Sequence, residues 1–302
     1  MQTKSAFRDE GRWYKGNTHA HTNLSDGVLS PQQLVELYRT LGYDFCAITD
    51  HRIYGVHAEL SSAGFLVLPG VELDVGVEGG AALCHHVVGL AIPGRNSCVH
   101  GQRFEYEQHA GVQQIISLLQ QRGNLCIYAH PSWSHVEHQL IDELDGIAAL
   151  EIYNHECEVC AVSGYAESHY DRLLWRGRRA WCIASDDSHQ HQPDYGGGFL
   201  MVKAAELTQA AIIDALLEGS FYASQGPQIH SFRVENNSAL LSCSPCRTIG
   251  FLSDSRPGRA ITREQAEVSR ASYPIDGSET YVRAVCIDHS GRRAWTQPIW
   301  LD

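Results

Sequence analysis

The sequence lacks the features that would direct the chain to a membrane or out of the cell. Residues 1–10 are polar and do not contain the apolar core of a signal peptide. No apolar stretch approaches the roughly 20 residues that a membrane-spanning helix needs. There is also no internal repeat and no low-complexity tract. We therefore expect a soluble globular protein of the cytoplasm that makes no contact with a membrane.

Basic residues are scarce in this chain. Lys and Arg together number 23, whereas Asp and Glu number 35, which gives a formal net charge of -12. Proteins that bind nucleic acid stably usually present a basic face to the phosphates. The composition therefore argues against a general nucleic-acid-binding protein, although it does not exclude a local basic pocket.

The ten cysteines do not form the pattern of a disulfide framework or of a zinc fold. Without an export signal, we expect them to be reduced thiols. Two C-x-x-C pairs occur, Cys157/Cys160 and Cys243/Cys246, but a zinc ion between them would need two distant segments to meet. We interpret both pairs as incidental thiols. The chain also has no Gly-x-Ser-x-Gly motif, so we expect no serine nucleophile.

Histidine is the residue that the chain has in unusual number, with 17 in 302 residues. Hydrophobic residues make up 43% and charged residues 19%, which is typical of a soluble enzyme with a sizeable core. The length suffices for one large domain and a small one. Clustered histidines indicate metal binding or acid–base chemistry.

The segment GNTHAHTNLSDG at residues 16–27 contains the most informative histidines. His19 and His21 are two residues apart, and on a strand such residues face the same side. Asp26 follows in a predicted turn. Imidazole and carboxylate together suit zinc, manganese or iron. A single H-x-H motif is weak evidence for a metal site, so further metal-binding residues elsewhere in the chain are needed to support it.

Hydrophobic patterns and turn residues predict alternating strands and helices as far as about Gly226. The predicted strands cover residues 13–22, 43–49, 65–68, 86–90, 124–129, 146–153, 180–184 and 198–203. The predicted helices cover residues 31–41, 112–119, 164–174 and 207–217. Such alternation is typical of a βα repeat with a parallel sheet, either open or closed into a barrel.

The pattern changes after Pro227. Residues 231–234, 239–243, 248–252, 280–287 and 293–300 are predicted to be short strands, and no helix is expected among them. We therefore predict a main α/β domain at residues 1–228 and a small all-β domain at residues 229–302. Because so small a domain has little core of its own, we expect it to pack on the main domain or to form a homo-oligomer.

Polar residues of the metal-binding type recur where the predicted strands end. They are His19, His21, Asp26, His51, Glu72, His86, His130, Asp187 and His189. A lone histidine is more often an ordinary polar residue, but random placement would seldom produce the joint pattern. A site built from many strand ends favours a barrel over an open sheet. Nine donors exceed the needs of one tetrahedral ion, so we expect two or three divalent ions.

In their order along the chain, several of these motifs resemble one known family. HAHTNLSDG, ITDH, GVELD, HHVVGL, YAHP and SDDSH resemble the polymerase and histidinol phosphatase (PHP) superfamily of metallohydrolases over residues 13–227. The segments HPSWS, EIYN, the three glycines at 196–198, FYASQGP and the β tail are similar to the branch that includes carbaryl-type carbamate hydrolases. The resemblance implies a distorted (β/α)7 barrel that holds up to three ions, commonly zinc, iron or manganese.

The resemblance also implies how the donors are divided among three ions. The first ion would have two histidines and two carboxylates as ligands: His19, His21, Glu72 and Asp187. Glu72 would bridge to a second ion, which would also bind His86 and His130. The third ion would bind Asp26, His51 and His189.

Two of these assignments required a choice between neighbours. We predict His86 and not His85 because it directly precedes the apolar strand, and Asp187 and not Asp186 because the family pattern is Asp-x-His. We expect the unused neighbours to face away.

Catalysis would then depend on the ions and on Glu72, Asp187 and His189. A water that bridges two cations loses a proton near neutral pH and becomes the nucleophile, and the cations neutralise the developing oxyanion. An ion or a histidine can stabilise the leaving oxygen.

Further residues have open roles at this stage. Asp50 is either a carboxylate that orients an imidazole or a cap at a strand end. Asn154 and His169 are candidates for the wall of the pocket. Arg95 and Arg103 either contact a phosphate or are solvated loop charges.

The sequence therefore predicts a metal-dependent hydrolase, first of all a phosphoesterase that acts on a small phosphorylated metabolite or nucleotide. A carbamate or carboxylic ester hydrolase with the same metal site is one alternative. A metal-binding scaffold or partner-binding module without activity is another, although the complete set of nine donors argues against it.

Overall fold

The computed structural model describes residues 3–76, 84–107, 110–255, 258–263 and 266–301. The strands that precede residue 226 are β1 (Lys4–Ser5), β2 (Arg12–Asn17), β3 (Phe45–Ile48), β4 (Leu66–Gly76), β5 (Cys84–Ala91), β6 (Asn124–Tyr128), β7 (Ala149–Asn154), β8 (Trp181–Ser185), β9 (Phe199–Ala204) and β10 (Phe221–Ser224). The helices are α1 (Pro31–Thr40), α2 (Val112–Gln121), α3 (His138–Asp142), α4 (His155–Ala161), α5 (Glu167–Trp175), α6 (Gln209–Glu218) and the 3-10 helix η1 (Ala58–Leu60). The later strands are β11 (Ile229–Glu235), β12 (Ser238–Cys246), β13 (Thr248–Ser253), β14 (Arg259–Thr262), β15 (Val268–Pro274), β16 (Tyr281–Ile287), β17 (Arg293–Thr296) and β18 (Ile299–Trp300).

Helix α1 shows how local sequence produces the elements of the first part. Ser30 caps it through a capping box with Gln33, and Pro31 occupies the first turn, where a missing N–H costs nothing. Its apolar stripe buries Leu34 and Tyr38. Each predicted helix of this part is present, with small shifts at its ends.

The predicted strands are also present, but β4 is longer than expected. It continues to Gly76, so Glu72 lies inside a strand and not after one. The extension pairs with β5, from Gly70 opposite Leu90 to Gly76 opposite Cys84. Pairing between segments that are distant in the sequence therefore determined where this strand ends.

The expectation of a parallel sheet is wrong for half of the strand pairs among β2 to β10. β2 and β3, β3 and β4, β6 and β7, and β7 and β8 are parallel pairs. The pairs β4–β5, β5–β6, β2–β9 and β9–β10 are antiparallel. Only residues 77–83 separate β4 from β5, whereas a parallel crossover needs about a dozen residues or more.

The main sheet does not close into a hydrogen-bonded (β/α)7 barrel. In the described part of the chain its strands follow the order β14-β13-β16-β17-β10-β9-β2-β3-β4-β5-β6-β7-β8, with β18 paired to β16. β8 is therefore the last strand, and its edge is satisfied by a side chain. Cys182 N–H donates to Gln297 Oε1 and Gln297 Nε2 donates to the Cys182 carbonyl, both at 2.8 Å.

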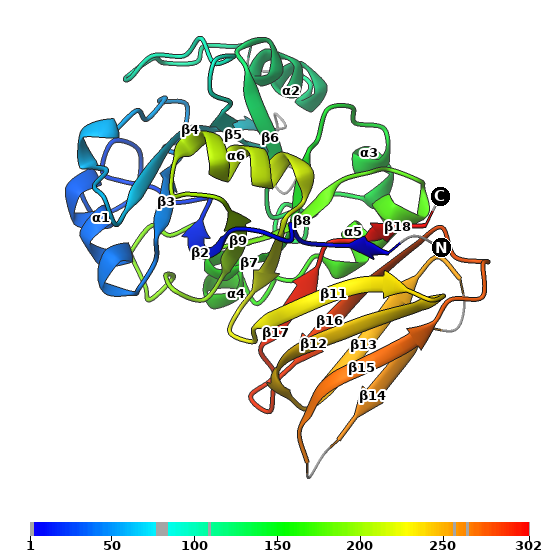
Figure 1. Ribbon diagram of the computed structural model, residues 1–302. Coiled ribbons are helices and arrows are strands. Elements are labelled where there is room, and N and C mark those ends of the chain that lie inside the picture. Colours follow the sequence, from blue (N-terminus) through cyan, green and yellow to red (C-terminus); the bar gives the residue numbers. More distant parts are fainter. Residues whose placement is uncertain (1–2, 77–83, 108–109, 256–257, 264–265, 302) are drawn as a thin grey trace.

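The described residues from 229 onward form strands and no helix, but these strands are not separate from the rest (Figure 1). β17 pairs with β10 and so continues the main sheet. The second sheet has the order β1-β11-β12-β15 and includes a strand from the N-terminus. The first and last described strands meet, because Lys4 Nζ of β1 donates to the Trp300 carbonyl of β18 at 2.8 Å. A structurally independent all-β domain is therefore not confirmed.

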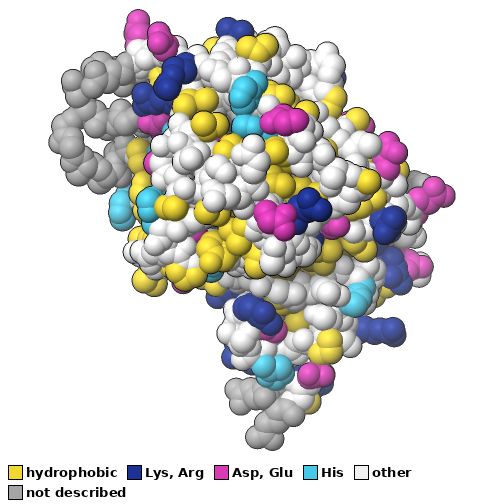
Figure 2. Space-filling view, turned by 90° about the vertical axis from the view of Figure 1, so that its left-hand side faces the viewer, with side chains coloured by type: hydrophobic (Ala, Val, Ile, Leu, Met, Phe, Trp, Pro, Cys, Tyr) yellow, Lys and Arg dark blue, Asp and Glu magenta, His cyan; other side chains and the backbone are white. Residues whose placement is uncertain are grey.

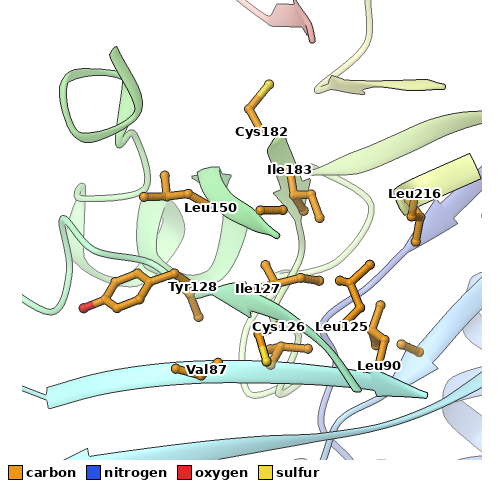
Figure 3. Close-up of a cluster of buried hydrophobic side chains, with 14 of the residues drawn as sticks. Val87, Leu90, Leu125, Cys126, Ile127, Tyr128, Leu150, Cys182, Ile183 and Leu216 are labelled. Atoms are coloured by element: carbon orange, nitrogen blue, oxygen red, sulfur yellow. The ribbon is translucent and has the colours of Figure 1, made fainter. Parts of the chain in front are cut away.

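The main hydrophobic core lies under the strands that carry the polar cavity described below. Figure 3 shows side chains of β5, β6, β7, β8 and α6 converging there, among them Leu90, Ile127 and Leu150. Trp295 of β17 belongs to the same core and is fully buried. Burial of one such large apolar side chain contributes about 1.5–3 kcal/mol.

The surface gives no sign of a single dominant charge on the face shown in Figure 2, where acidic and basic side chains lie interspersed. Within the described ranges, no helix has both the length and the apolar character needed to cross a membrane.

Candidate metal centre

The nine predicted donors converge on one cavity of about 270 Å³. Seven of them line it: Asp26, His51, Glu72, His86, His130, Asp187 and His189. His19 and His21 lie beneath these residues and are fully buried. Residues that are far apart in the sequence are therefore neighbours here.

Strand direction explains why they meet. His19, His51, His130 and Asp187 follow the carboxyl ends of β2, β3, β6 and β8. β5 runs antiparallel to β4, so His86 near its start lies opposite Asp74, at the same edge of the sheet.

The first group of donors contains His19, His21, Glu72 and Asp187. His19 Nε2 lies 3.1 Å from Asp187 Oδ1 and 3.2 Å from Glu72 Oε1. His21 Nε2 lies 3.1 Å from Asp187 Oδ1 and 3.2 Å from Glu72 Oε2. The two imidazole Nε2 atoms face each other at 3.2 Å. All four side chains thus point at one small volume.

The Glu72 carboxylate is the centre of the whole arrangement. Five imidazoles approach it within 3.4 Å: His19, His21, His51, His86 and His130. The side chain itself is buried. A carboxylate surrounded in this way can contribute one oxygen to each of two neighbouring cation sites.

The outermost group surrounds Asp26, whose side chain is half exposed. His189 Nε2 lies 3.5 Å and His51 Nε2 lies 3.6 Å from its carboxylate oxygens. His189 Nδ1 is 2.8 Å from the Asp187 carbonyl. Donation of a proton to that carbonyl leaves the His189 Nε2 lone pair directed toward Asp26.

The donor groups agree with the expected division in part. The first group has the expected members. The second contains His51, Glu72 and His86, while His130 Nε2 lies 3.4 Å from Glu72 and 3.7 Å from Asp187. The third contains His21 in addition to the three expected residues. The division of ligands among ions stays a prediction.

Charge compensation dominates the electrostatics of the cavity. Burial disfavours an ionised Glu72, but His19, His86 and His51 hold its pKa well below the usual range. Burial likewise opposes protonation of His21, but hydrogen bonds with Asp187 and Glu72 raise its pKa to about 10. The buried carboxylates of Glu72 and Asp187 are therefore stabilised by nearby positive charge. Bound cations would supply this charge in place of protons on the histidines.

The donor set fits divalent metal ions. Asp187 Oδ1 and His51 Nδ1 are buried and make no hydrogen bond, although potential metal-ligand atoms of neighbouring side chains lie 3.1 Å from each. Ligands bound tetrahedrally at about 2.0–2.1 Å would lie about 3.3 Å apart, close to the separations in the first group. These side chains are thus directed at shared points and not at one another.

The backbone at two of these residues adopts the left-handed region. His130 has φ of 26° and Asp187 has φ of 54°. Such conformations are unfavourable for residues with a side chain and persist where surrounding structure enforces them, often at functional sites.

Sequence reasoning missed the carboxylate that orients His19. Glu151 of β7 is buried, and its Oε1 is 2.8 Å from His19 Nδ1. It also accepts hydrogen bonds from the backbone N–H of His130 and from Asn154 and Ser185. The sequence feature that could have indicated this role is a glutamate among the mostly apolar residues of a strand. This contact fixes the His19 tautomer and leaves its Nε2 free to bind a metal.

Replacing Glu151 with Gln is expected to weaken metal binding about 10–100-fold, because loss of an outer partner of a ligating imidazole has effects of this size. Competition with a metal chelator measures this affinity. Glu279→Gln is the matched control, since Glu279 is buried outside the cavity and accepts a hydrogen bond from Tyr273. Equal affinities of the two variants would contradict the orienting role.

The two choices between neighbours agree with the geometry. His86 Nδ1 lies 2.9 Å from Glu72, whereas His85 Nδ1 contacts the Tyr128 hydroxyl. Asp187 points into the cavity. Asp186 instead accepts hydrogen bonds from the backbone N–H groups of three glycines, Gly196, Gly197 and Gly198.

Asp50 stabilises the loop that carries the histidines and does not hydrogen-bond an imidazole in the described structure. It accepts from the Thr22 N–H and from the Thr22 hydroxyl, both at 2.7 Å. It also accepts from the Ser25 hydroxyl at 2.8 Å. These contacts are in keeping with a cap at the end of strand β3, one of the two roles that the sequence left open, and the role of Asp50 stays a prediction.

None of the four predicted substrate-contacting residues lines the cavity wall. His169 Nε2 is 2.9 Å from the Val136 carbonyl, and its ring stacks on His138. Arg95 and Arg103 do not line the cavity either. Asn154 lies beneath it, where its Nδ2 donates to Glu151 and to Asp187. Arg95 and Arg103 lie in loops, whose side chains have no repeating pattern, whereas His169 lies on α5 and Asn154 ends β7.

The described wall also contains six residues that the sequence did not indicate: Trp133, Glu156, Cys157, Cys160, His191 and Asp194. Trp133 contacts the His130 ring edge-on, with 5.0 Å between ring centroids, and is about one-third exposed. The wall includes no Lys or Arg among the residues that the structure describes.

Comparison with solved structures shows which known fold this chain resembles. A crystal structure from Bacteroides vulgatus, described as a two-domain protein containing a predicted PHP-like metal-dependent phosphoesterase, aligns with a TM-score of 0.52 and 14% identity. The alignment covers 98% of this chain and 89% of that one. The chain shares the fold of this PHP-like protein. At this identity the likeness concerns the fold alone, and the carbaryl-type branch is not confirmed.

Other matches are weaker or shorter. An amidohydrolase from Chromobacterium violaceum aligns with a TM-score of 0.44 and 17% identity over 59% of this chain and 89% of that one, which does not establish a shared fold. A curated 5'-3' exoribonuclease from Haemophilus influenzae is 38% identical over 80 residues, which are 25% of this chain and 28% of that protein. No family model matches the chain.

Proposed function

We propose that the chain is a metal-dependent hydrolase of the PHP superfamily that cleaves a phosphoester of a small phosphorylated metabolite or nucleotide. The observation that supports this most strongly is the convergence of nine metal-type donors, with five imidazoles around Glu72. The PHP-like fold is in keeping with it.

The side chains would divide the work as follows. Divalent ions, when bound, activate water and neutralise charge on a phosphoryl oxygen. Glu72 and Asp187 hold the buried histidines in place and confer the negative charge that attracts cations. Glu151 keeps His19 in the required tautomer. His189 and Asp26 line the cavity, and the Asp26 side chain is half exposed, so a leaving oxygen would depart beside them.

Two observations bear on the substrate. The match to a protein named 5'-3' exoribonuclease favours a phosphodiester or nucleotide substrate. The net charge of -12 argues against stable binding of long nucleic acid. A small phosphorylated molecule satisfies both observations.

An aryl carbamate is the second candidate substrate. The described wall lacks Lys and Arg but presents the Trp133 ring, and an uncharged aryl ester needs an aromatic contact more than a counter-charge. A non-catalytic metal-binding scaffold is the alternative from another class.

Protein purified without chelator is expected to contain two or three divalent ions per chain, because nine donors exceed the needs of one ion. Elemental analysis for zinc, manganese and iron measures this. A folded protein that takes up no metal would contradict the proposal.

The same preparation should be assayed with phosphomonoester, phosphodiester and aryl-carbamate substrates. Phosphoester cleavage that is abolished by chelator and restored by manganese or zinc is the expected result. Cleavage of the carbamate alone would favour the second candidate, and metal binding without any turnover would favour the scaffold.

A further inference from the structure

A second cluster of metal-type side chains lies outside the cavity, between the two sheets of the C-terminal part. The sulfur atoms of Cys243, Cys246 and Cys286 all lie within 4.8 Å of one another. The three residues are at most 5% exposed and belong to the hydrophobic core between these sheets. All three are free thiols.

The backbone of β12 is shaped so that both cysteines of the C-x-x-C pair point inward. In a regular strand, residues three apart face opposite sides. Here the pairing of β12 with β15 shifts register between Ser242 and Cys246, as in a β-bulge. Ser244 and Pro245 occupy the interruption, and Pro245 is exposed. Cys243 and Cys246 consequently face the same core.

The third sulfur comes from the opposite sheet. Cys286 lies on β16 and pairs with Ile249 of β13, whereas β12 belongs to the four-stranded sheet. The sequence directed attention to Cys157/Cys160 as the possible partner of this pair. The fold instead places Cys286 beside it, from a segment about 40 residues further along the chain.

We propose that Cys243, Cys246 and Cys286 bind one thiophilic d10 cation, Cu(I) or Zn(II), which links the two sheets of the C-terminal part. Thiolate donors select these cations over harder ions. No fourth His, Cys, Asp or Glu joins the group within the described residues. Three sulfur donors suit Cu(I), whereas Zn(II) would need a water or another outside group as its fourth ligand.

The alternatives explain the cluster less well. Incidental core cysteines would not require a bulge that turns two of them toward a third. A disulfide would use two sulfurs and leave the third beside it without a role.

The test uses the full chain, reduced and freed of metal. Cu(I) is titrated against a Cu(I) chelator, and Co(II) is titrated separately as a spectroscopic substitute for Zn(II). One Cu(I) per chain with sulfur-only coordination in X-ray absorption, or one Co(II) with thiolate-to-metal charge-transfer absorption, is expected. The histidine and carboxylate donors of the main cavity cannot produce either sulfur signature. Cys157 and Cys160 also line that cavity, so a Cys157→Ala/Cys160→Ala variant, which is expected to keep the signature, excludes them as its source.

Variants assign the signature to these residues. Cys246→Ala and Cys286→Ala are expected to abolish it, whereas Cys182→Ala, which removes another buried thiol, should retain it. Cys243→Ser provides a conservative variant should an alanine variant fail to fold.

The wild-type titrations alone can overturn the proposal. Absence of sulfur coordination with both ions would do so, as would a signature that survives in the folded Cys243→Ser and Cys286→Ala variants. Because the readout is metal–sulfur coordination and not hydrolysis, it is independent of the proposed function.

Discussion

Glu72→Gln is expected to reduce kcat/KM by more than about 100-fold, beyond the 10–100-fold typical of an outer partner of a metal ligand. The carboxylate lies within 3.4 Å of five imidazoles, so the amide would remove the charge that two neighbouring cation sites share. The amide N–H₂ would also face imidazole nitrogens that are positioned to bind a cation. Activity and metal content of the same preparation should fall together.

Asp50→Asn is the comparison that makes this result interpretable. In the described structure the Asp50 carboxylate accepts hydrogen bonds only from Thr22 and Ser25, and an asparagine retains one of its acceptor oxygens. We therefore expect a loss of about 10-fold or less, at the lower end of outer-partner effects. A loss at Asp50 equal to or larger than the loss at Glu72 would show that the central role of Glu72 is wrong.

Removal of all residues after Pro227 is expected to leave an aggregated or strongly destabilised protein, although all nine donors precede that point. The truncation deletes β17, which pairs with β10, and Gln297, which satisfies the edge of β8. It also deletes Trp295 from the main core, where loss of a large aromatic side chain costs about 3–5 kcal/mol. The whole free energy of unfolding of a typical domain is only about 5–15 kcal/mol.

Melting temperature, oligomeric state and metal content of the truncated chain measure this effect. Trp295→Ala in the full chain isolates the core contribution, and Trp175→Ala is its control because Trp175 is about half exposed. A soluble, fully metallated truncation with an unchanged melting temperature would show that the C-terminal part is an independent module. That outcome would also strengthen the scaffold alternative.

Local sequence determined most individual elements and the donors of the cavity. Ser30, Pro31 and the apolar stripe of α1 define a helix through contacts within a few residues. His19 and His21 follow a strand in sequence, and their proximity requires only that both face the same side. The donors could be selected because imidazole and carboxylate are restricted residue types at recurring strand ends.

Only the tertiary structure decided how these elements are paired and which hidden residues support them. β5 runs antiparallel because the short connection from β4 forbids a crossover, and β8 ends the sheet because Gln297, more than 100 residues away, occupies its edge. Glu151 reaches His19 from another strand, and Cys286 reaches the C-x-x-C pair from the opposite sheet. The residues in such contacts are far apart in the sequence and share no periodic pattern. Their contacts could therefore not be predicted from the sequence alone.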